Sequence, residues 1–430
     1  MLTFLSEGLS HTTAWETESL PKGQSIITVV NGLFNRSKPK INREQFFRWL
    51  TGFIDGEGNF QVYLDRDYLR VMFRISLHID DIAVLHKIRD FLGVGRVTIC
   101  VRSNSCLFII SDVNNLLTVL FPLIDKYHLY TTKWLDYVDF KSVVLILAEK
   151  NTTRLSSSEL DLVRSIMSRM NSGRTEYNYD LIPTIIVNPF WLLGFIEAEG
   201  TFGFKNLSPY FQIGQHIRNS MVLKAITIYL ESLPKGFTFS THSAVPLVTN
   251  TFNDRTSVSV ISILNIDILY DYLMFFLLDM PFQTRKSEDF YYWSLVLHLH
   301  KLGHFYLPKG RVLVYQISKY VNKGRYSTNL NCVLAPSFSD INQVLELKLP
   351  VTLQPDMLHV DLAKAFARTV KQNSIWVYDN GELLREEPFT SFGKAMEAIG
   401  YSKSSIAARR SIDTGKLIGG RYTFYSKPLC

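Results

Sequence analysis

The stretch Trp49–Phe60, which reads WLTGFIDGEGNF, returns almost letter for letter at Trp191–Phe202 as WLLGFIEAEGTF. Each copy is a short apolar run with small residues four positions apart: Gly52 and Gly56 in the first, Gly194 and Ala198 in the second. Residues four apart share one face of a helix, so we expect the two helices to cross with their backbones in contact. The duplication predicts a chain built from two related halves.

Each run ends in an acid followed by a glycine, Glu57-Gly58 and Glu199-Gly200. The glycine suits a helix C-cap, whereas the acid stands at the unfavourable end of the helix dipole. If the helices pack side by side, both carboxylates emerge at the same end, where they form a site for Mg²⁺ or a similar hard cation. The alternative is a pair of buried glycine-containing helices with solvated acids, and the repeated register argues against it.

The segments LTGFIDGEG (Leu50–Gly58) and LLGFIEAEG (Leu192–Gly200) resemble the two signatures of a single-chain LAGLIDADG homing endonuclease, with the acid at the eighth position of each. The resemblance covers roughly residues 42–297. It implies an α+β fold of two pseudo-symmetric αββαββα halves, which form a saddle of two antiparallel sheets. It also implies hydrolysis of double-stranded DNA at a specific site, with Mg²⁺ or Mn²⁺ held by Glu57 and Glu199.

Composition agrees with a chain of two or three domains and permits a polyanionic partner. The 430 residues are 47% hydrophobic, with a net charge of +7 and a pI near 9.0. The four cysteines show no CxxC spacing, which argues against a disulfide framework or a zinc site. The start of the chain is unlike a secretory or an Arg-rich transit peptide. Asp267, Asp271 and Asp279 interrupt the apolar segment Ile261–Phe282, which we interpret as a core helix, and we expect no membrane partner.

The first half alternates between helical spacing and strand spacing. Residues 69–78 and 96–102 alternate apolar and polar side chains, and 59–64 and 106–111 complete four short strands. Helical spacing at 42–58, 80–92 and 113–127 then gives the order helix, hairpin, helix, hairpin, helix. This order predicts an antiparallel sheet with helices on one face and the other face open.

The open face of that sheet carries basic side chains, namely Arg70, Arg74, His78, Arg96 and Arg102. A small sheet fits the major groove of DNA, where arginine and glutamine pair with base edges. The alternative is an ordinary solvated sheet face, and the duplicated signature favours DNA contact instead.

The second half repeats the plan with different polar residues. Phe73–Ile88 aligns without a gap on Phe211–Ile226, which pairs Arg74 with Gln212 and His78 with His216. Further polar strand positions are Thr238, Ser240, His242, Ser257 and Ser259. Because this face has more amides and hydroxyls than arginines, we expect the two halves to prefer different bases.

Two further positions enter through the resemblance. Tyr130–Phe140 is echoed by Gln283–Trp293, so that Lys133 corresponds to Lys286. In the family a lysine here lies near the active site, where an ammonium offsets charge that develops on the phosphate; the alternative is a surface lysine at a helix start. Family members often carry glutamine where Gln215 stands, but the first half has Leu77. We therefore expect unequal catalysis on the two strands, with nicking of one strand favoured.

We divide the chain into an N-terminal extension (1–41), a first half (42–150), a linker (151–188), a second half (189–310), a connector (311–373) and a C-terminal unit (374–430). The last unit has helix, glycine turn and helix between two strands, the pattern of a helix-turn-helix, with Lys403, Arg409 and Arg410 positioned for phosphate or groove contact. Through Ser391–Lys416 it resembles the NUMOD-type modular DNA-binding units attached to homing endonucleases. Its glutamates keep an interaction domain open as the alternative.

We therefore predict a monomeric, site-specific DNA endonuclease that promotes mobility of its host intron. The alternative is a maturase that binds its host intron RNA and assists group I splicing. A regulator without cleavage is a third option, against which the acids at both eighth positions argue. Intron residence and a mitochondrial origin follow from the resemblance alone. We expect no metal at His298, His300 and His304, because His298 and His300 lie on different faces of a helix.

Overall fold

Two short helices begin the two halves of the molecule. The computed structural model describes residues 39–66, 68–150, 155–233, 248–354, 357–369 and 374–429. Helix α2 (Arg43–Glu57) begins at Asn42, whose side chain accepts a hydrogen bond from the Gln45 amide and forms a capping box. Helix α8 (Pro189–Glu199) begins at Asn188, whose side chain accepts a hydrogen bond from the Phe190 amide, with proline in its first turn.

The two helices cross in backbone contact, as the small residues predict. A Cβ atom added to Gly52 would lie 2.0 Å from the Trp191 carbonyl oxygen, and one added to Gly194 would lie 2.0 Å from the Trp49 carbonyl oxygen. One turn later, a Cβ on Gly56 would lie 2.3 Å from that of Ala198. Alanine fits at one side of this last contact only because glycine faces it.

The glycines at the ends of these helices are required because a larger residue would not fit there. Gly58 and Gly200 have φ values of −71° and −74°, so neither adopts the left-handed conformation of a typical C-cap glycine. A Cβ at Gly58 would instead lie 2.6 Å from Ile54 Cγ2. The chain can therefore pass from helix into strand without an intervening loop.

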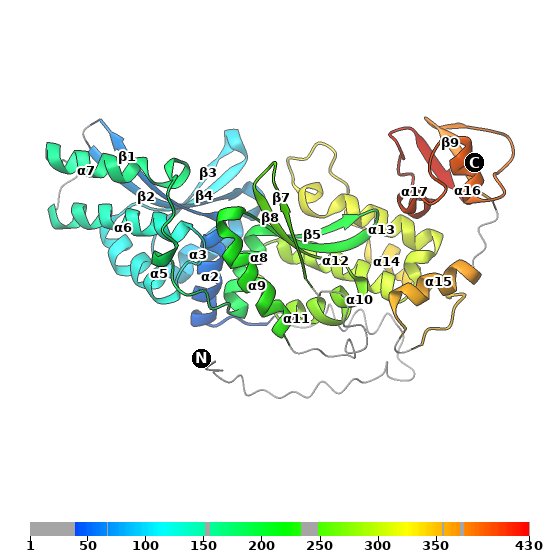
Figure 1. Ribbon diagram of the computed structural model, residues 1–430, viewed down its shortest axis with the longest axis horizontal. Helices are drawn as coiled ribbons and strands as arrows, with labels where there is room; N and C mark the ends of the chain where they lie inside the picture. The colour runs from blue at the N-terminus through cyan, green and yellow to red at the C-terminus, as the bar shows by residue number, and fades with distance from the viewer. Residues whose placement is uncertain are drawn as a thin grey trace.

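Each helix leads into a four-stranded antiparallel sheet. The first consists of β1 (Gly58–Asp65), β2 (Tyr68–His78), β3 (Arg96–Cys100) and β4 (Ser105–Ile110), in the order β1-β2-β4-β3. The second consists of β5 (Gly200–Lys205), β6 (Ser208–His216), β7 (Thr249–Asn253) and β8 (Val258–Ile263), in the order β5-β6-β8-β7. The identical order confirms the predicted α+β fold of two related halves, which lie side by side (Figure 1). Thr238, Ser240 and His242 lie outside the described residues.

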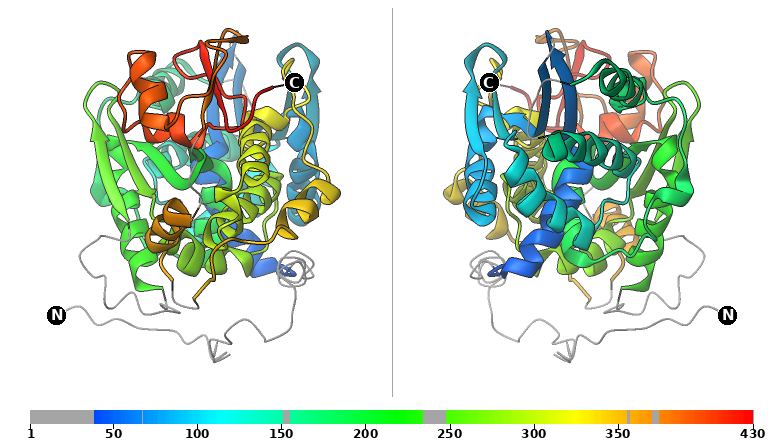
Figure 2. Two further views of the ribbon diagram at one scale, coloured as in Figure 1. Left: turned by 90° about the vertical axis from the view of Figure 1, so that its right-hand side faces the viewer. Right: turned by 90° about the vertical axis from the view of Figure 1, so that its left-hand side faces the viewer.

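Helices cover one face of each sheet and leave the other face open (Figures 1 and 2). The first sheet packs on α3 (Ile82–Leu92) and α6 (Lys133–Lys150), and the second on α9 (Ser220–Ser232) and α12 (Lys286–Lys301). Along β2 the apolar side chains Leu69, Val71, Phe73 and Ile75 are buried, while Arg70 and Ser76 are exposed. The period-two alternation is confirmed there.

Two predicted elements have different bounds in the structure. The strand predicted over 96–102 ends at Cys100, and Val101–Ser103 forms a 3₁₀ turn that leaves Val101 78% exposed. Since β3 is an edge strand paired only with β4, the chain can reverse at Asn104, which has a positive φ of 49°. The segment Ile261–Phe282 begins as the end of β8, and its helical part starts only at Ile266.

That helical part shares a further feature with its counterpart in the first half. In the second half, α10 (Ile266–Ile268) and α11 (Phe275–Leu278) flank a π-helical segment, Leu269–Met274. The helix predicted over 113–127 likewise consists of α4 (Val113–Asn115), a π segment and α5 (Phe121–Tyr127). Among the described helices, none is both long and apolar enough to cross a bilayer.

The end of the chain forms a separate small unit beyond the second half (Figures 1 and 2). Helix α13 (Pro308–Tyr320), α14 (Phe338–Leu345) and α15 (His359–Thr369) precede it. The unit itself has a sheet of β9 (Trp376–Asp379), β10 (Glu382–Leu383) and β11 (Tyr422–Tyr425), with α16 (Phe392–Ala398) and α17 (Ile406–Arg410) beside it. Its own apolar core includes Val377, Met396, Ile412 and Phe424.

Gly52→Ala tests the helix contact. The added methyl group overlaps the Trp191 carbonyl, so the helices must separate, and we expect a loss of about 2–3 kcal/mol in the free energy of unfolding. Urea titrations followed by tryptophan fluorescence measure it, because Trp49 and Trp191 are buried at the contact.

The matched control is Gly393→Ala in α16, where the nearest atom to the added Cβ is 3.9 Å away. We expect it to change stability by less than about 1 kcal/mol. If Gly52→Ala unfolds at the same urea concentration as the wild type, the helices are not held by backbone contact.

Candidate active site

Glu57 and Glu199 lie next to each other where α2 and α8 end. The Cβ position of Gly56 is 3.1 Å from Glu199 Cγ, and Glu57 lines an open cleft of about 1010 Å³ between the halves. Burial raises the pKa of Glu57 to about 7, and the negative charge of Glu199 adds to that rise. The tertiary structure thus brings the two predicted carboxylates together.

Two lysines supply positive charge at the same place. Lys133 Nζ donates hydrogen bonds to the carbonyl oxygens of Ile54 (3.0 Å) and Gly56 (2.7 Å), and Lys286 Nζ donates to that of Gly200 (2.5 Å). These carbonyls lie where α2 and α8 end, and the Ile54 carbonyl also accepts a hydrogen bond from the Gly58 amide. Burial lowers the pKa of both lysines, while the nearby carboxylates oppose that fall. The lysines therefore compensate the acids that stand at the negative helix ends.

A second pair of acids, which the sequence analysis missed, joins the halves. Asp55 accepts hydrogen bonds from the amides of Tyr130 and Thr131 and from Trp191 Nε1 of the other half, at 2.9–3.0 Å. Glu197 makes the equivalent bonds to Gln283, Thr284 and Trp49 Nε1. Each acid thus holds the start of the helix that carries a lysine. The available signal was an acid at the sixth position of both signatures and a tryptophan before each.

Burial raises the pKa of both members of this second pair, to about 7 for Glu197. Their hydrogen bonds oppose that rise, because the donors favour the charged carboxylate. Neither side chain is free to hold an ion, since its oxygens already accept several donors.

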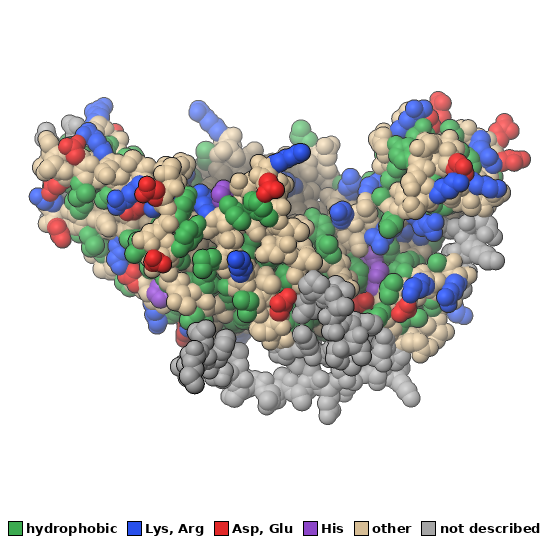
Figure 3. Space-filling model, in the orientation of Figure 1, with side chains coloured by type: hydrophobic (Ala, Val, Ile, Leu, Met, Phe, Trp, Pro, Cys, Tyr) green, Lys and Arg blue, Asp and Glu red, His purple; other side chains and the backbone are tan. Residues whose placement is uncertain are grey.

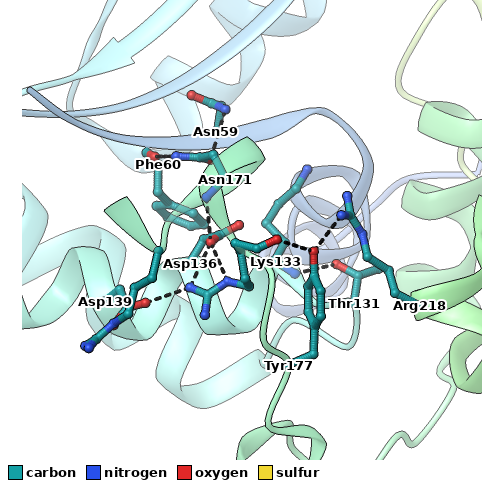
Figure 4. A network of polar contacts seen from close by, with 11 residues as sticks. Asn59, Phe60, Thr131, Lys133, Asp136, Asp139, Asn171, Tyr177 and Arg218 are labelled. Carbon is teal, nitrogen blue, oxygen red and sulfur yellow. Dashed lines mark hydrogen bonds and ion pairs between the residues drawn. The ribbon is translucent and has the colours of Figure 1, made fainter. Parts of the chain in front are cut away.

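A second repeat closes each half, and it too was missed. Asn171-Ser-Gly-Arg174 follows α7 (Ser157–Ser168), and Asn322-Lys-Gly-Arg325 follows α13. Asn171 donates from its amide to Asp136 and from its side chain to the Phe60 carbonyl at the start of β1 (Figure 4). Asn322 makes the same two bonds to Asp289 and Phe202. The signal in the sequence was the pattern Asn-x-Gly-Arg after a helix. The two copies lie in the segments that we predicted to be the linker (151–188) and the connector (311–373).

Glu57 and Glu199 suit a divalent cation whose remaining ligands come from a substrate and from water. Among the described residues, no group of three or more acidic, histidine or cysteine side chains is arranged to hold a metal ion by itself. Mg²⁺ is often bound by only one or two carboxylates together with phosphate oxygens and water. The like charges of Glu57 and Glu199 destabilise each other in a buried position, and a cation between them would relieve that repulsion.

The candidate DNA face is built from both sheets. Arg70, Arg96 and Arg102 are exposed, and Arg74 is half-buried on the same strand as Arg70. In the second sheet His216 is exposed, whereas Gln212 donates to Ser262 Oγ at 2.9 Å. Figure 3 shows Lys and Arg side chains along the upper rim, above the level of the helices.

His78 differs from the other predicted contacts because another segment covers it. Residues 326–333, here called the cross-strap, run from the end of the second half to the first sheet. Tyr326 stacks on the His78 ring with centroids 4.2 Å apart, and Thr328 Oγ1 lies 2.9 Å from His78 Nε2. Asp80 accepts hydrogen bonds from the amide and hydroxyl of Ser327. The His78 ring therefore contacts the cross-strap and is covered by it.

Two other predicted residues lie apart from that face. Gln215 accepts a hydrogen bond from Asn219, whose side chain accepts one from the Thr132 amide beside Lys133. Arg410, which the sequence predicts at the DNA, lies 5.9 Å from the centre of the Phe305 ring, where burial lowers its pKa. Helix α17 directs the Arg410 side chain toward Phe305 of the second half, and its phosphate contact stays a prediction.

The remaining residues singled out are accounted for within the fold. Lys403 is exposed and pairs with Glu397 at 2.9 Å, and Arg409 is exposed beside Phe392. His298 and His300 are buried, and burial lowers the pKa of each. His300 Nε2 lies 3.0 Å from the Leu207 carbonyl oxygen, and His298 Nδ1 lies 2.8 Å from the Tyr270 hydroxyl.

Known proteins resemble this chain in sequence. Residues 50–144 match the model of the LAGLIDADG endonuclease family. The "Uncharacterized mitochondrial protein RF1" of Saccharomyces cerevisiae is 27% identical over 92% of this chain and 85% of its own length. The "Probable intron-encoded endonuclease 3" of Neurospora crassa is 25% identical over 60% of this chain, which spans only about half (54%) of that protein.

A solved structure shares the fold. The crystal structure of the I-SmaMI LAGLIDADG homing endonuclease bound to cleaved DNA superimposes with a TM-score of 0.55 and 22% identity. The match covers 67% of this chain and 100% of that chain, and identity this low relates the folds alone.

Asp80→Ala tests the attachment of the cross-strap. The Ser327 amide loses a charged acceptor 2.8 Å away, so we expect its hydrogen exchange to accelerate at least about tenfold. Hydrogen–deuterium exchange mass spectrometry of peptides that span 326–333 measures this. Asp90→Ala is the control, because Asp90 is exposed on α3 and pairs with the neighbouring Arg89. Unchanged exchange in Asp80→Ala would mean that the cross-strap is held by other contacts.

Proposed function

We propose that this chain, whose residues 50–144 match the LAGLIDADG endonuclease family and whose halves share that fold, is a site-specific endonuclease for double-stranded DNA. The observation that carries the proposal is the pair of carboxylates, Glu57 and Glu199, at the adjoining ends of α2 and α8, where Glu57 lines an open cleft. Both are flanked by lysines whose ammonium groups meet the same helix ends.

Glu57 and Glu199 would hold Mg²⁺ or Mn²⁺, and phosphate oxygens and water would complete the ligand set. When bound, the ion supplies Lewis-acid stabilisation of negative charge on the scissile phosphate. The contribution of the protein to this arrangement is rigidity, because backbone contact between the helices fixes the separation of the two acids.

Lys133 and Lys286 stabilise the charge that develops on the phosphates. An ammonium in a buried, preorganised position acts more strongly than one in water. Asp55 and Glu197 act as positioning residues. Each holds the turn before a lysine-bearing helix through backbone amides, and that turn is tied to the other half by a tryptophan.

The two strands of DNA meet unequal surroundings. In the second half, Asn219 accepts a hydrogen bond from the Thr132 amide next to Lys133 and donates one to Gln215. The corresponding residues of the first half are Leu77 and Asp81, and Asp81 is an acid in the same cleft. We propose that this difference makes cleavage of one strand faster than cleavage of the other.

Recognition would combine the two open sheet faces. Arg70, Arg74 and Arg96 offer guanidinium groups to the major groove on one side, whereas Gln212 and His216 offer an amide and an imidazole on the other. Because both halves belong to one chain, we propose that it acts as a monomer on an asymmetric site. The printed names of the relatives, mitochondrial or intron-encoded, support residence in a mitochondrial intron and a role in intron mobility.

Glu57→Gln and Glu199→Gln test the acids. Each replaces a charged ligand by a neutral one of the same shape, and we expect loss of double-strand cutting by at least about 10³-fold. The substrate is DNA of the joined exons of the host gene, incubated with Mg²⁺ and analysed on gels. Glu44→Gln, an exposed acid in the first turn of α2, is the control and should cut normally.

Binding in Ca²⁺ and thermal unfolding separate catalysis from folding in these variants. We expect both variants to be at least as stable as the wild type, because burial and like charge oppose ionisation of Glu57. Full cutting by either variant would remove that acid from the mechanism. No cutting by the wild type, with tight binding to the intron transcript, would favour the RNA maturase instead.

Lys133→Met and Lys286→Met test the lysines. Methionine keeps most of the side-chain length without the charge, and we expect cleavage to slow by about 10²–10³-fold while binding in Ca²⁺ changes little. Strand-specific end labels reveal which cut each lysine serves.

Lys150→Met is the control for the lysine variants. Lys150 lies at the other end of α6 from Lys133, and it is exposed and paired with Glu159. Equal rates for Lys133→Met, Lys286→Met and Lys150→Met would mean that the two buried lysines only maintain the fold.

A further inference from the structure

One arginine joins the C-terminal unit to the second half. Arg311 of α13 is 8% exposed and directs all three guanidinium nitrogens to partners. Nε donates to the Ile412 carbonyl at 3.0 Å, Nη2 to Asp413 at 2.9 Å, and Nη1 to the Tyr306 carbonyl at 2.9 Å. Two of these partners belong to the C-terminal unit and one to the second half, so a single side chain spans the junction.

The partner of Arg311 is itself fixed inside the C-terminal unit. Asp413 accepts hydrogen bonds from the amide and hydroxyl of Ser426, and its own amide donates to the Phe424 carbonyl of β11. Arg410 lies against Phe305 beside this contact. A buried guanidinium that donates to three separate acceptors resists rotation, unlike an exposed ion pair.

Helix α13 connects the junction to the central cleft. Arg311 stands near its first turn, whereas Lys319 near its last turn lines the cleft together with Lys323. Eight residues of α-helix separate Arg311 and Lys319, or about 12 Å. The C-terminal unit is thus held at a set distance from the candidate active site by one rigid element.

The unit also stands on the side where DNA would lie. In the view of Figure 1, helices α2, α3, α5, α10 and α11 lie below the sheets, and the C-terminal unit rises at the far end of the second half. Figure 3 shows Lys and Arg side chains around the notch between the second half and the unit. Lys309, Lys319 and Lys323 are exposed on the second-half side, and Lys403 and Arg409 on the unit.

We propose that the C-terminal unit is docked through Arg311 so that it continues the DNA-binding surface on the second-half side only, and that its partner is the duplex flanking the target site. This inference rests on the proposed endonuclease function. Lys403 and Arg409 contact phosphates, whereas Arg410 belongs to the junction. A unit of 57 residues is about 25 Å across, so it extends protection by about eight base pairs on that flank.

Hydroxyl-radical footprinting on the joined-exon duplex in Ca²⁺ tests the proposal with the full chain. We expect the wild type to protect the central site and a longer flank on one side. Arg311→Met keeps an apolar stem in the buried position but removes all three donors. It should lose the outer flank while central protection persists.

A second arm does not depend on how well Arg311→Met folds. The double variant Lys403→Ala/Arg409→Ala changes only exposed side chains, and it should lower the slope of log K against log salt by about two. Its charge-matched control is Arg89→Ala/Lys364→Ala, on α3 and α15 below the sheets, which should leave the slope unchanged.

The outcomes are distinct. Two results overturn the docking inference and leave the endonuclease proposal standing. One is a footprint of equal length on both flanks. The other is an outer flank that stays protected in Arg311→Met together with an unchanged salt slope in the double variant. Absence of any protected site on the joined-exon duplex overturns the proposed function and this inference with it.

Discussion

The contact between two helix backbones is the constraint on which the rest of the structure depends. Gly52 and Gly194 leave no room for a Cβ atom, because each faces a main-chain carbonyl of the other helix. A second contact one turn later, between Gly56 and Ala198, keeps the two helices together at their C-terminal ends. The acids at those ends therefore become neighbours, and the lysines that meet the last carbonyls become neighbours of the acids.

If dispersion forces alone held this contact, the two helices could shift along each other. Reciprocal hydrogen bonds fix its register, since Trp49 donates to Glu197 and Trp191 donates to Asp55. Both acids are buried, and each also holds the start of a lysine-bearing helix. The same few bonds thus set the helix register and the lysine positions, which explains why polar groups are retained at the centre of an apolar interface.

The two halves share the same framework of contacts, so the positions at which their residues differ are informative. Both halves end in an Asn-x-Gly-Arg segment that binds the first strand, and both segments lead toward the opposite half. Tyr177 meets Arg218 after the first segment, whereas Ser327 meets Asp80 after the second. The charges at these two positions are opposite, so the two sides of the cleft present different electrostatic surroundings to a symmetric polyanion such as duplex DNA.

The sequence by itself determined the duplicated framework: the helix contact, the succession of helices and strands in each half, and the identity of the paired acids. These follow from local patterns, because small-residue spacing and period-two alternation each specify one element and its buried face. Only the tertiary structure decided which groups from distant segments meet. The roles of Asp55 and Glu197, the cover on His78 and the position of Arg410 against the second half depend on partners from distant parts of the chain. The separation is 136 residues for Asp55 and Trp191, and the partners of His78 and Arg410 are Tyr326 and Phe305. No local pattern encodes such a partner, since the same side chain is compatible with solvent, with DNA or with a neighbouring segment until the packing of the whole chain is fixed.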